Sequence, residues 1–165
     1  MKTLLLMRHA KSSWEDENLD DHDRPLSKRG RRAAPRMGRL IRDLGLVPDF
    51  IVSSTAVRAL GTARMLAAEC GYAGIIREDP SLYAAPDNAY AAALRRLPKQ
   101  VVRPLIVGHN PAVETLLRRL TAVDMHVPTG ALAQITLPDG PWAAMECSPV
   151  GHLEGFWKPR DLPEG

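Results

Sequence analysis

The sequence predicts an α/β fold, a three-layer α/β/α sandwich in which helices cover both faces of a mostly parallel central sheet. Short apolar runs alternate along the chain with longer segments of helical periodicity, the pattern that βαβ units produce. In addition, two apolar runs end in a histidine: residues 3–7 lead into Arg8 and His9, and residues 105–107 lead towards His109. Strand ends that carry reactive side chains are typical of active sites in open α/β sheets.

Strands are expected wherever a short run of apolar residues is bounded by turn residues. The last two are expected to form a hairpin, because residues 138–141 read Pro-Asp-Gly-Pro, a sequence that favours a tight turn. Residues 150–165 combine Gly, Pro and mixed charge, so we expect them to lie on the surface as a tail anchored by Phe156 and Trp157. The predicted strands are 2–8, 49–53, 74–78, 103–108, 130–137 and 142–147.

Helices are expected in the segments between the strands. Ser27 is a favourable N-cap for the first of them, and Gly45 is a favourable stop. Pro35 lies inside that segment, so it should kink the helix or delay its start. We expect Asp87 to cap the third helix and Asn110 to cap the fourth, where a proline follows at the first helical position. The predicted helices cover 27–44, 56–69 and 87–97, and the fourth begins at 110–111.

Length and composition restrict the classes of function to consider. A chain of 165 residues with 45% hydrophobic and 25% charged residues predicts one globular domain over residues 1–165. The net charge of +3 is mild and aromatic residues make up only 5%, which argues against nucleic-acid binding. The apolar run at 4–7 is too short to cross a membrane. The isolated Cys70 and Cys147 favour a reducing, cytoplasmic location.

Arginines accompany both histidines, and this combination points to chemistry on a phosphoryl group. A guanidinium holds two phosphoryl oxygens at once and keeps its charge, while neutral imidazole is a capable nucleophile near pH 7. Arg8 precedes His9 directly, and Arg58 lies in the first turn of a helix that follows another predicted strand. His109 and Asn110 stand where a further helix begins, and helix N-termini attract anions. The sequence therefore predicts an anion-binding site at the carboxyl edge of the sheet.

These motifs resemble those of the histidine phosphatase superfamily, also called the phosphoglycerate-mutase-like family. The matching residues are the Arg8-His9 pair, the pattern S-x-x-x-R-A-x-x-T-A at 54–63, and His109. Three further stretches are similar to the small SixA-type phosphohistidine phosphatases: LLLMRHAKSSW at 4–14, DRPLSKRG at 23–30 and PRDL at 159–162. The resemblance covers nearly the whole chain in order, and it implies a phosphoglycerate-mutase-like fold.

The resemblance implies a role for each matching residue. His9 would attack phosphorus and form a transient phosphohistidine. Arg8, Arg58 and His109 would hold the phosphoryl oxygens, with His109 protonated and donating a hydrogen bond. The arginines would supply the charge, so no metal or other cofactor is expected. Residues beside these motifs that we expect to contact substrate are Lys11, Ser12 and Asn110, together with Arg24, for which a salt bridge within its loop is the alternative.

One departure from the family pattern concerns the leaving group. Members that cleave phosphate esters carry a carboxylate in the loop after the third strand, which protonates the leaving oxygen. Here the expected position after Leu82 is occupied by Tyr83. Asp87 and Glu114 are the remaining candidate acids, although a helix cap and a first-turn charge explain them more simply. Because a phosphorylated imidazole leaves without such an acid, the departure favours a phosphoramidate substrate.

We therefore predict a metal-independent phosphatase whose substrate is phosphohistidine on a protein, such as a phosphotransfer domain. A phosphatase of small phosphate monoesters and a phosphohistidine-binding module without turnover are the alternatives. The loop at 11–25 is expected over the mouth of the site. A row of basic residues follows in the first helix, and it is either an ordinary solvated face or a surface that steers an acidic partner. Its members are Lys28, Arg29, Arg31, Arg32, Arg36 and Arg39.

Overall fold

The computed structural model describes residues 1–146 and 148–163. Within them, strands and helices alternate as far as the fourth helix, and two further strands follow. The strands are β1 (Lys2–Arg8), β2 (Phe50–Ser53), β3 (Ile76–Glu78), β4 (Pro104–Gly108), β5 (Leu132–Leu137) and β6 (His152–Trp157). The helices are α1 (Lys28–Asp43), α2 (Val57–Cys70), α3 (Ala89–Arg95) and α4 (Ala112–Thr121). Short 3-10 turns are η1 (Asp21–Asp23), η2 (Pro80–Leu82), η3 (Trp142–Ala144) and η4 (Pro159–Asp161).

The strands form a six-stranded sheet in the order β3-β2-β4-β1-β5-β6. The first four of these run parallel to their neighbours, whereas β5 pairs antiparallel with β1, and β6 pairs antiparallel with β5. This mainly parallel sheet confirms the predicted α/β class. None of the helices in residues 1–146 and 148–163 is both long and apolar enough to cross a lipid bilayer.

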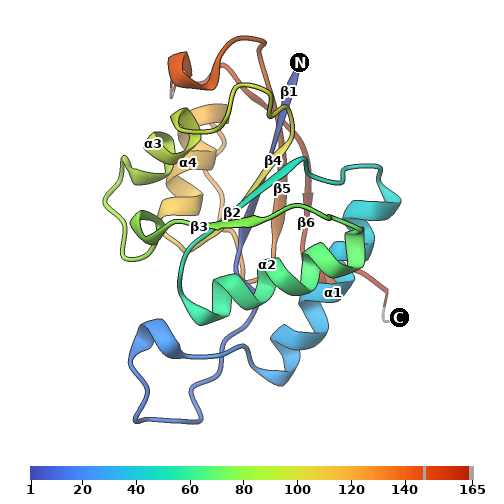
Figure 1. Cartoon of the computed structure of the whole chain (residues 1–165), viewed down its shortest axis with the longest axis vertical. Coiled ribbons are helices and arrows are strands. Elements are labelled where there is room, and N and C mark those ends of the chain that lie inside the picture. The colour runs from blue at the N-terminus through green and yellow to red at the C-terminus, as the bar shows by residue number, and fades with distance from the viewer. Residues whose placement is uncertain (147, 164–165) are drawn as a thin grey trace.

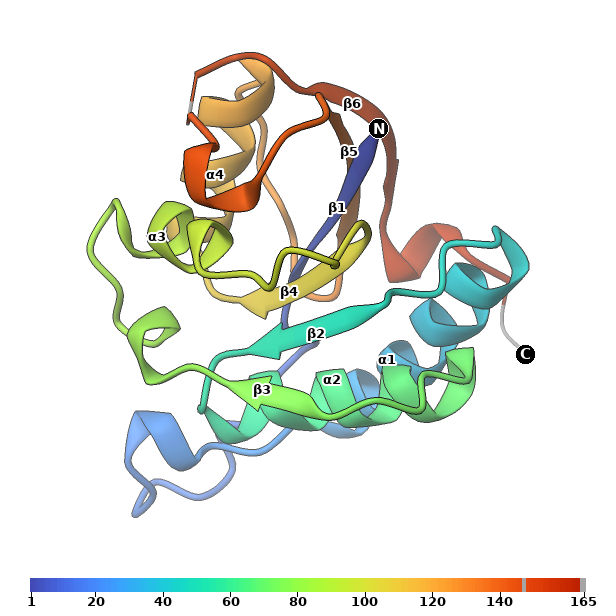
Figure 2. The same cartoon turned by 45° about the horizontal axis from the view of Figure 1, so that its top comes forward.

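Helices cover both faces of the sheet, so the molecule has three layers. In Figures 1 and 2, α1 and α2 lie on one face, while α3 and α4 lie on the opposite face. Alternate residues of β1 point into two cores: Leu4 and Leu6 pack with α3 and α4, whereas Leu5 and Met7 pack with α1 and α2. All four side chains are fully buried, as expected for a central strand that is covered on both faces.

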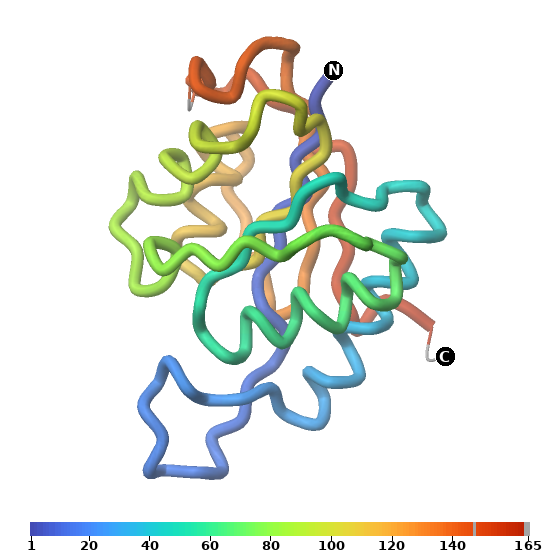
Figure 3. The backbone as a smooth tube through the Cα atoms, in the orientation of Figure 1, coloured from blue at the N-terminus to red at the C-terminus, as the bar shows by residue number. Residues whose placement is uncertain are grey.

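The strand order places a switch point between β1 and β4. From β1 the chain crosses through α1 to β2 on one side, and from β4 it crosses through α4 to β5 on the other side. Arg8 at the end of β1 is the register partner of Gly108 at the end of β4. His9 and His109 therefore leave the sheet side by side, where open α/β sheets bind ligands. Figure 3 shows the loop after β1 projecting beyond the helices at this end of the sheet.

The ends of α1 follow the predicted capping residues. The Ser27 hydroxyl accepts a hydrogen bond from the Gly30 N–H at 3.1 Å. Gly45, just past the end of the helix, has a φ of 70°, a left-handed conformation that glycine adopts without strain. Pro35 lies within α1, and the helix nevertheless begins at Lys28, so the proline does not delay its start.

The prediction for the C-terminal hairpin is wrong. Residues 142–146 form no strand: Trp142 begins η3, its ring is buried, and its Nε1–H donates to Val101 O at 2.7 Å. The last residue of the predicted strand, Cys147, lies outside the described residues. The sheet edge beside β5 is taken instead by β6, which falls in the segment expected to be a surface tail. Burial of a large aromatic ring here outweighs the local strand pattern.

Two predicted helix caps are also wrong. Asn88 occupies the N-cap of α3, and Asp87 lies exposed in front of it. At α4 the N-cap is Pro111, and Asn110 instead donates its Nδ2–H to Val127 O at 2.8 Å. A hydrogen bond to the neighbouring loop thus replaces the bond that a capping asparagine would make with its own helix.

Candidate active site

The ends of β1 and β4 bring the two predicted histidines together. The His9 N–H donates to Gly108 O at 3.0 Å, which extends the contact between the strands by one residue. The ring centroids of His9 and His109 are 5.0 Å apart, close enough for both rings to touch one tetrahedral anion. Both line a cavity of about 340 Å³, which Arg8 and Arg58 also line. The structure therefore brings all four residues of the predicted catalytic set together around one cavity.

His9 is held as a neutral imidazole with one free nitrogen. Its Nδ1 lies 2.7 Å from Ala10 O, and a carbonyl oxygen can only accept, so Nδ1 carries the proton and Nε2 keeps its lone pair. Burial, and after it the positive charges of Arg58 and Arg8, lowers the pKa of His9 from 6.5 to about 4. Near pH 7 this ring is uncharged, and its Nε2 can attack phosphorus.

His109 is positioned by two hydroxyl groups. Its backbone N–H donates to Tyr90 Oη at 2.8 Å, and its Nε2 lies 2.8 Å from Ser54 Oγ. Burial, the neighbouring His9 and Arg58 lower the pKa of His109 to about 3. In this structure the His109 ring is therefore neutral near pH 7, because desolvation and nearby cations oppose a further positive charge. Protonation of the ring beside a bound phosphoryl group stays a prediction. A neutral imidazole still has one N–H that can be donated to a phosphoryl oxygen.

Thr62 joins the loop after His9 to the start of α2. The Ala10 N–H donates to Thr62 Oγ1 at 3.0 Å, and the Thr62 hydroxyl donates to Arg58 O at 2.7 Å. Thr62 is fully buried, and it lies on the same helix face as Arg58 because the two are four residues apart. The Thr62 hydroxyl thus holds the backbone next to His9 against α2, the helix that carries Arg58.

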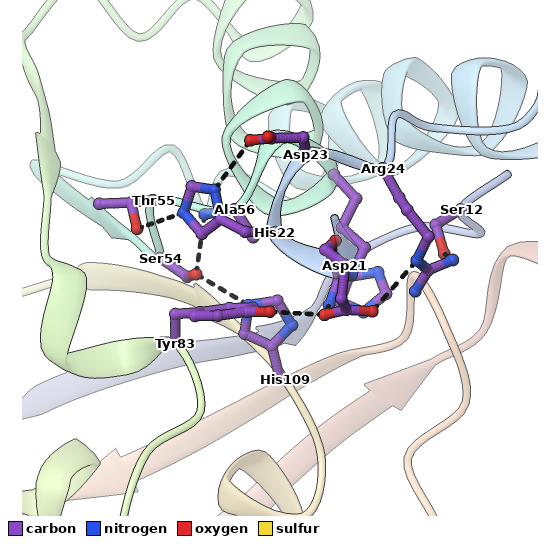
Figure 4. A network of polar contacts seen from close by, with 12 residues as sticks. Ser12, Asp21, His22, Asp23, Arg24, Ser54, Thr55, Ala56, Tyr83 and His109 are labelled. Carbon is purple, nitrogen blue, oxygen red and sulfur yellow. Dashed lines mark hydrogen bonds and ion pairs between the residues drawn. The ribbon is translucent and has the colours of Figure 1, made fainter. Parts of the chain in front are cut away.

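Asp21 accepts hydrogen bonds from several side chains on one side of the cavity (Figure 4). Arg58 donates from Nη1 to Asp21 O at 2.6 Å and from Nη2 to Asp21 Oδ2 at 3.0 Å. Arg24 Nε donates to Oδ1 at 3.1 Å, and the Tyr83 hydroxyl donates to Oδ2 at 2.7 Å. The Tyr83 hydrogen bond, followed by those of the arginines, holds the pKa of Asp21 well below its usual range. Asp21 therefore stays an anion that orients Arg58.

Arg58 has N–H groups that its contacts with Asp21 do not use. A guanidinium has five N–H groups, and the contacts with Asp21 use two of them. The Arg58 Nε–H and the Arg8 Nε–H are both buried without a hydrogen-bond partner. Buried donors without acceptors are costly, so their presence in one cavity indicates a ligand that carries acceptor oxygens.

Residues of the loop at 11–25 form another wall of the cavity. Arg24 is buried, donates to Ser12 Oγ at 2.8 Å, and stacks against the Trp14 ring with its guanidinium carbon 3.4 Å from the ring centroid. The alternative of a salt bridge within the loop is confirmed, because Arg24 pairs with Asp21. Arg24 also lines the cavity, and its contact with substrate stays a prediction. Ser12 is occupied by Arg24, whereas Lys11 lies exposed at the rim.

Tyr83 fills the position where the family pattern has an acid. Its ring meets that of His109 edge to face, with centroids 5.6 Å apart. Its hydroxyl donates to Asp21, and this hydrogen bond to a carboxylate raises the pKa of Tyr83. Because a phenol of raised pKa holds its proton tightly, Tyr83 is poorly suited to protonate a leaving alkoxide.

Neither of the alternative acids lines the cavity. Asp87 lies exposed before α3, and Glu114 accepts a hydrogen bond from the Val127 N–H at 2.7 Å and pairs with His126 at 2.8 Å. Glu114 lies in the first turn of α4, where a negative charge is favourable. The carboxylate that lines the cavity, within residues 1–146 and 148–163, belongs to Asp21, and its lowered pKa makes it a weak proton donor.

The cavity as a whole is cationic. Its charged lining residues in the described part of the chain are Arg8, Lys11, Arg24 and Arg58, opposed by Asp21. Asn110 and Thr129 add polar groups, and Asn110 Oδ1 is buried without a partner. In the same part of the chain, no group of three or more His, Cys, Asp or Glu side chains is arranged to hold a metal ion. The arrangement suits binding of a tetrahedral oxyanion beside a neutral imidazole nucleophile.

Among the residues that line this cavity, Asp21, Tyr83 and Trp14 were not predicted as site residues from the sequence. Asp21 lies in an acidic loop without periodicity, so nothing in its spacing distinguishes it from its acidic neighbours. The sequence did give a reason to consider Tyr83, because it occupies the position where the family pattern has an acid. It gave one for Ser54 as well, since Ser54 opens the S-x-x-x-R pattern, and the structure shows it beside the His109 ring.

Comparisons with known proteins agree with this geometry. The sequence model of the histidine phosphatase superfamily (branch 1) matches residues 4–83. An uncharacterized protein of Mycobacterium tuberculosis is 33% identical over 165 residues, which cover 93% of this chain and 100% of the relative. The SixA structure from Agrobacterium tumefaciens is 27% identical with a TM-score of 0.81, and the match covers 96% of this chain and 98% of that one.

A third match shows the shared fold. The protein histidine phosphatase SixA, solved in complex with tungstate, has a TM-score of 0.82 at 20% identity, and the match covers 98% of this chain and 99% of that one. Together with the family match and the site, these likenesses define the class of protein. The chain belongs to the histidine phosphatase superfamily, in its SixA-type branch, and it is a phosphatase.

The two active-site histidines are expected to stay neutral from about pH 8 down to about pH 5. Their pKa values of about 4 (His9) and about 3 (His109) lie below the value of about 6.5 for an unfolded chain. Imidazole ¹⁵N NMR should show His9 as the Nδ1–H form over this range, and a histidine in an unstructured peptide is the reference. A titration midpoint for His9 above about 6 would contradict the assignment.

The same pKa values affect stability. Between about pH 6.5 and pH 4 the unfolded chain binds more protons at His9 and His109 than the folded protein does. The free energy of unfolding should therefore fall as the pH is lowered through this window. Denaturant unfolding followed by circular dichroism at each pH measures this free energy.

Proposed function

We propose that this protein hydrolyses phosphohistidine on another protein, with His9 as the transient carrier of the phosphoryl group. The observation that carries the proposal is the state of His9: a buried neutral imidazole whose Nε2 is free, in a cavity lined by Arg8, Arg24 and Arg58. The tungstate complex of a SixA with the same fold supports it, because tungstate, like phosphate, is a tetrahedral oxyanion.

In the first step, His9 Nε2 forms a bond to phosphorus while the bond between phosphorus and the substrate nitrogen breaks. The substrate imidazole can take a proton from water on its second nitrogen beforehand, and it then leaves as neutral imidazole. The phosphorylated His9 retains its Nδ1–H, and the resulting positive charge is stabilised by the hydrogen bond to Ala10 O. One phosphoramidate bond replaces another, so this step is close to balanced in energy.

In the second step, a water oxygen attacks phosphorus and the bond to His9 Nε2 breaks. His9 returns to its neutral form, inorganic phosphate departs, and one proton of the water goes to solvent. Arg8 and Arg58 hold the equatorial oxygens in both steps, and His109 donates its N–H to the same group. The spare N–H groups of the two arginines are the donors that this role requires.

The leaving group favours phosphohistidine over a phosphate ester. An alkoxide must be protonated as it leaves, and a positioned acid contributes about 10²–10⁴ to that step. The cavity offers Tyr83 and Asp21, whose pKa values are shifted away from what an acid needs. A phosphorylated imidazole has no such requirement, so the missing acid costs it nothing.

Two peptides of the same sequence test the proposal, one carrying phosphohistidine and the other phosphoserine at the same position. We expect kcat/KM to be at least about 10²-fold higher for the phosphohistidine peptide, with many turnovers per enzyme, measured as released phosphate. Equal rates on both peptides would contradict the proposal and favour the monoesterase alternative. Release of no more than one equivalent of phosphate would contradict it in favour of a binding module.

A further inference from the structure

A second cavity lies beside the catalytic one, and phosphoryl transfer leaves it unexplained. It measures about 350 Å³ and lies between α1, the turn before β5, and η4. We call it the basic groove, because it is lined by six basic side chains: Lys11, Arg29, Arg32, Arg36, Lys158 and Arg160.

Few negative charges balance the basic groove. Lys158 pairs with Asp161 at 3.6 Å, a long contact between partly exposed side chains that contributes little. No carboxylate pairs with Arg29 or Arg32 among residues 1–146 and 148–163. The Nε–H of Arg36 is buried and has no acceptor. A guanidinium donor without an acceptor is costly to bury, so this arginine is not neutralised by the protein around it.

The spacing of the arginines indicates the length of a ligand that would contact all of them. Arg29, Arg32 and Arg36 follow one face of α1 at intervals of three and four residues. Seven residues at about 1.5 Å each separate the first from the last by roughly 10 Å along the helix axis. One phosphate group cannot span this distance, whereas about three residues of extended peptide can, at about 3.3 Å each.

The residues that line the basic groove also restrict the class of ligand that it can bind. Its apolar residues in the described part of the chain are aliphatic or proline, and no aromatic ring among them offers a surface on which a nucleic-acid base could stack. An extended run of carboxylates therefore fits the basic groove better than a single-stranded nucleic acid does.

The basic groove adjoins the catalytic cavity, and Lys11 and Thr129 line both. A Cβ on Gly30 would lie 2.1 Å from Lys11 O, so α1 begins directly against the chain that follows the nucleophile. On the other wall, a Cβ on Gly130 would lie 2.8 Å from Pro159 Cγ, which shows how closely η4 packs on the turn before β5. A protein whose phosphohistidine occupies the catalytic cavity can therefore reach the basic groove with the residues that flank the phosphohistidine.

We propose that the basic groove binds an acidic segment of the phosphorylated protein, next to the phosphohistidine in the catalytic cavity. This inference rests on the proposed function and adds a recognition element to it. Ion pairs with the segment accelerate association and lower KM, while the bond-breaking steps at His9 are unaffected. Substrates are thus selected by the residues that flank the phosphohistidine as well as by the phosphoryl group.

Charge reversal on the exposed part of α1 tests the inference. The substrates are two phosphohistidine peptides, one with four glutamates on each side of the phosphohistidine and one with serine and glycine in their place. We expect the native protein to prefer the acidic peptide about tenfold in kcat/KM, mainly through KM, as two or three exposed ion pairs would give. In the double variant Arg29→Glu and Arg32→Glu, this preference should fall to about one.

The matched control is the double variant Arg64→Glu and Lys99→Glu, which changes the net charge equally at exposed positions outside both cavities. It should keep the tenfold preference, and an equal loss in the control would overturn the inference. So would a native protein that treats both peptides alike.

A direct binding measurement separates this inference from the proposed function. The acidic peptide without phosphate, labelled with fluorescein, should bind the native protein in fluorescence anisotropy, more weakly as salt is added, and should not bind the variant with Arg29→Glu and Arg32→Glu. Such binding without turnover of either phosphopeptide would support the basic groove while contradicting the proposed function. Tighter binding of single-stranded DNA than of the acidic peptide would overturn the inference.

Discussion

Replacing His9 with alanine is expected to lower kcat for phosphohistidine hydrolysis by at least about 10⁴-fold. The change removes the atom that attacks phosphorus, and enzymes that lose a covalent nucleophile retain only the contribution of binding and charge. The variant should also fail to accumulate phosphoenzyme, which rapid quenching at alkaline pH and intact-protein mass spectrometry would detect in the native protein as an added phosphoryl group.

His152→Ala is the matched control, because His152 is exposed at the start of β6 and lies outside the cavity. It should retain native kcat and native phosphoenzyme. Loss of the His9 ring leaves Ala10 O without its donor, at a cost of about 1–3 kcal/mol, so thermal unfolding of both variants must be compared. Phosphoenzyme in the His9→Ala variant would show that another residue is the nucleophile.

Replacing Arg58 with alanine is expected to lower kcat/KM by about 10²–10³-fold, the usual effect of removing one oxyanion donor. Arg58 supplies charge and N–H groups from α2, whereas Arg8 comes from the end of β1, and no other residue of α2 lines the cavity. Asp21 keeps its hydrogen bonds from Arg24 and Tyr83 in this variant, so the loop should remain in place. Steady-state kinetics with the phosphohistidine peptide measures the effect.

Two comparisons make the Arg58 prediction specific. Arg58→Lys keeps the positive charge but loses the planar fork, so it should recover only part of the activity. Arg64→Ala changes an exposed arginine six residues further along α2 and should leave kcat/KM unchanged. Equal losses in Arg58→Lys and Arg58→Ala would show that geometry matters more than charge, whereas native activity in Arg58→Ala would exclude Arg58 from the site.

Much of the fold and the central part of the site could be predicted because local patterns carried the information. The continuous apolar run of β1 requires burial on both faces, and burial on both faces requires helices in two layers. Histidines at the ends of β1 and β4 meet because parallel strands end at one edge of a sheet. Thr62 and Arg58 share a face because they lie one helical turn apart.

Other features depended on contacts between residues far apart in the sequence. Trp142 and Val101 form a hydrogen bond across 41 positions, and that contact, invisible to local periodicity, turned a predicted strand into η3. Asp21 and Tyr83 meet across 62 positions, and each alone is an unremarkable loop residue. The lowered pKa of His109 has no signal in the sequence for a related reason, because desolvation depends on what surrounds the ring and not on its neighbours in the chain.

The amino-acid sequence by itself determined the α/β class, the strand ends that carry the histidines, and the arginines that accompany them. Helical and strand periodicity and capping act over a few residues, so they can be read along the chain. Tertiary structure alone decided that β6 completes the sheet, that Asp21 orients Arg58, and that the arginines of α1 face η4 across the basic groove. Those features arise from packing and electrostatic interactions in space, where separation along the chain carries no information.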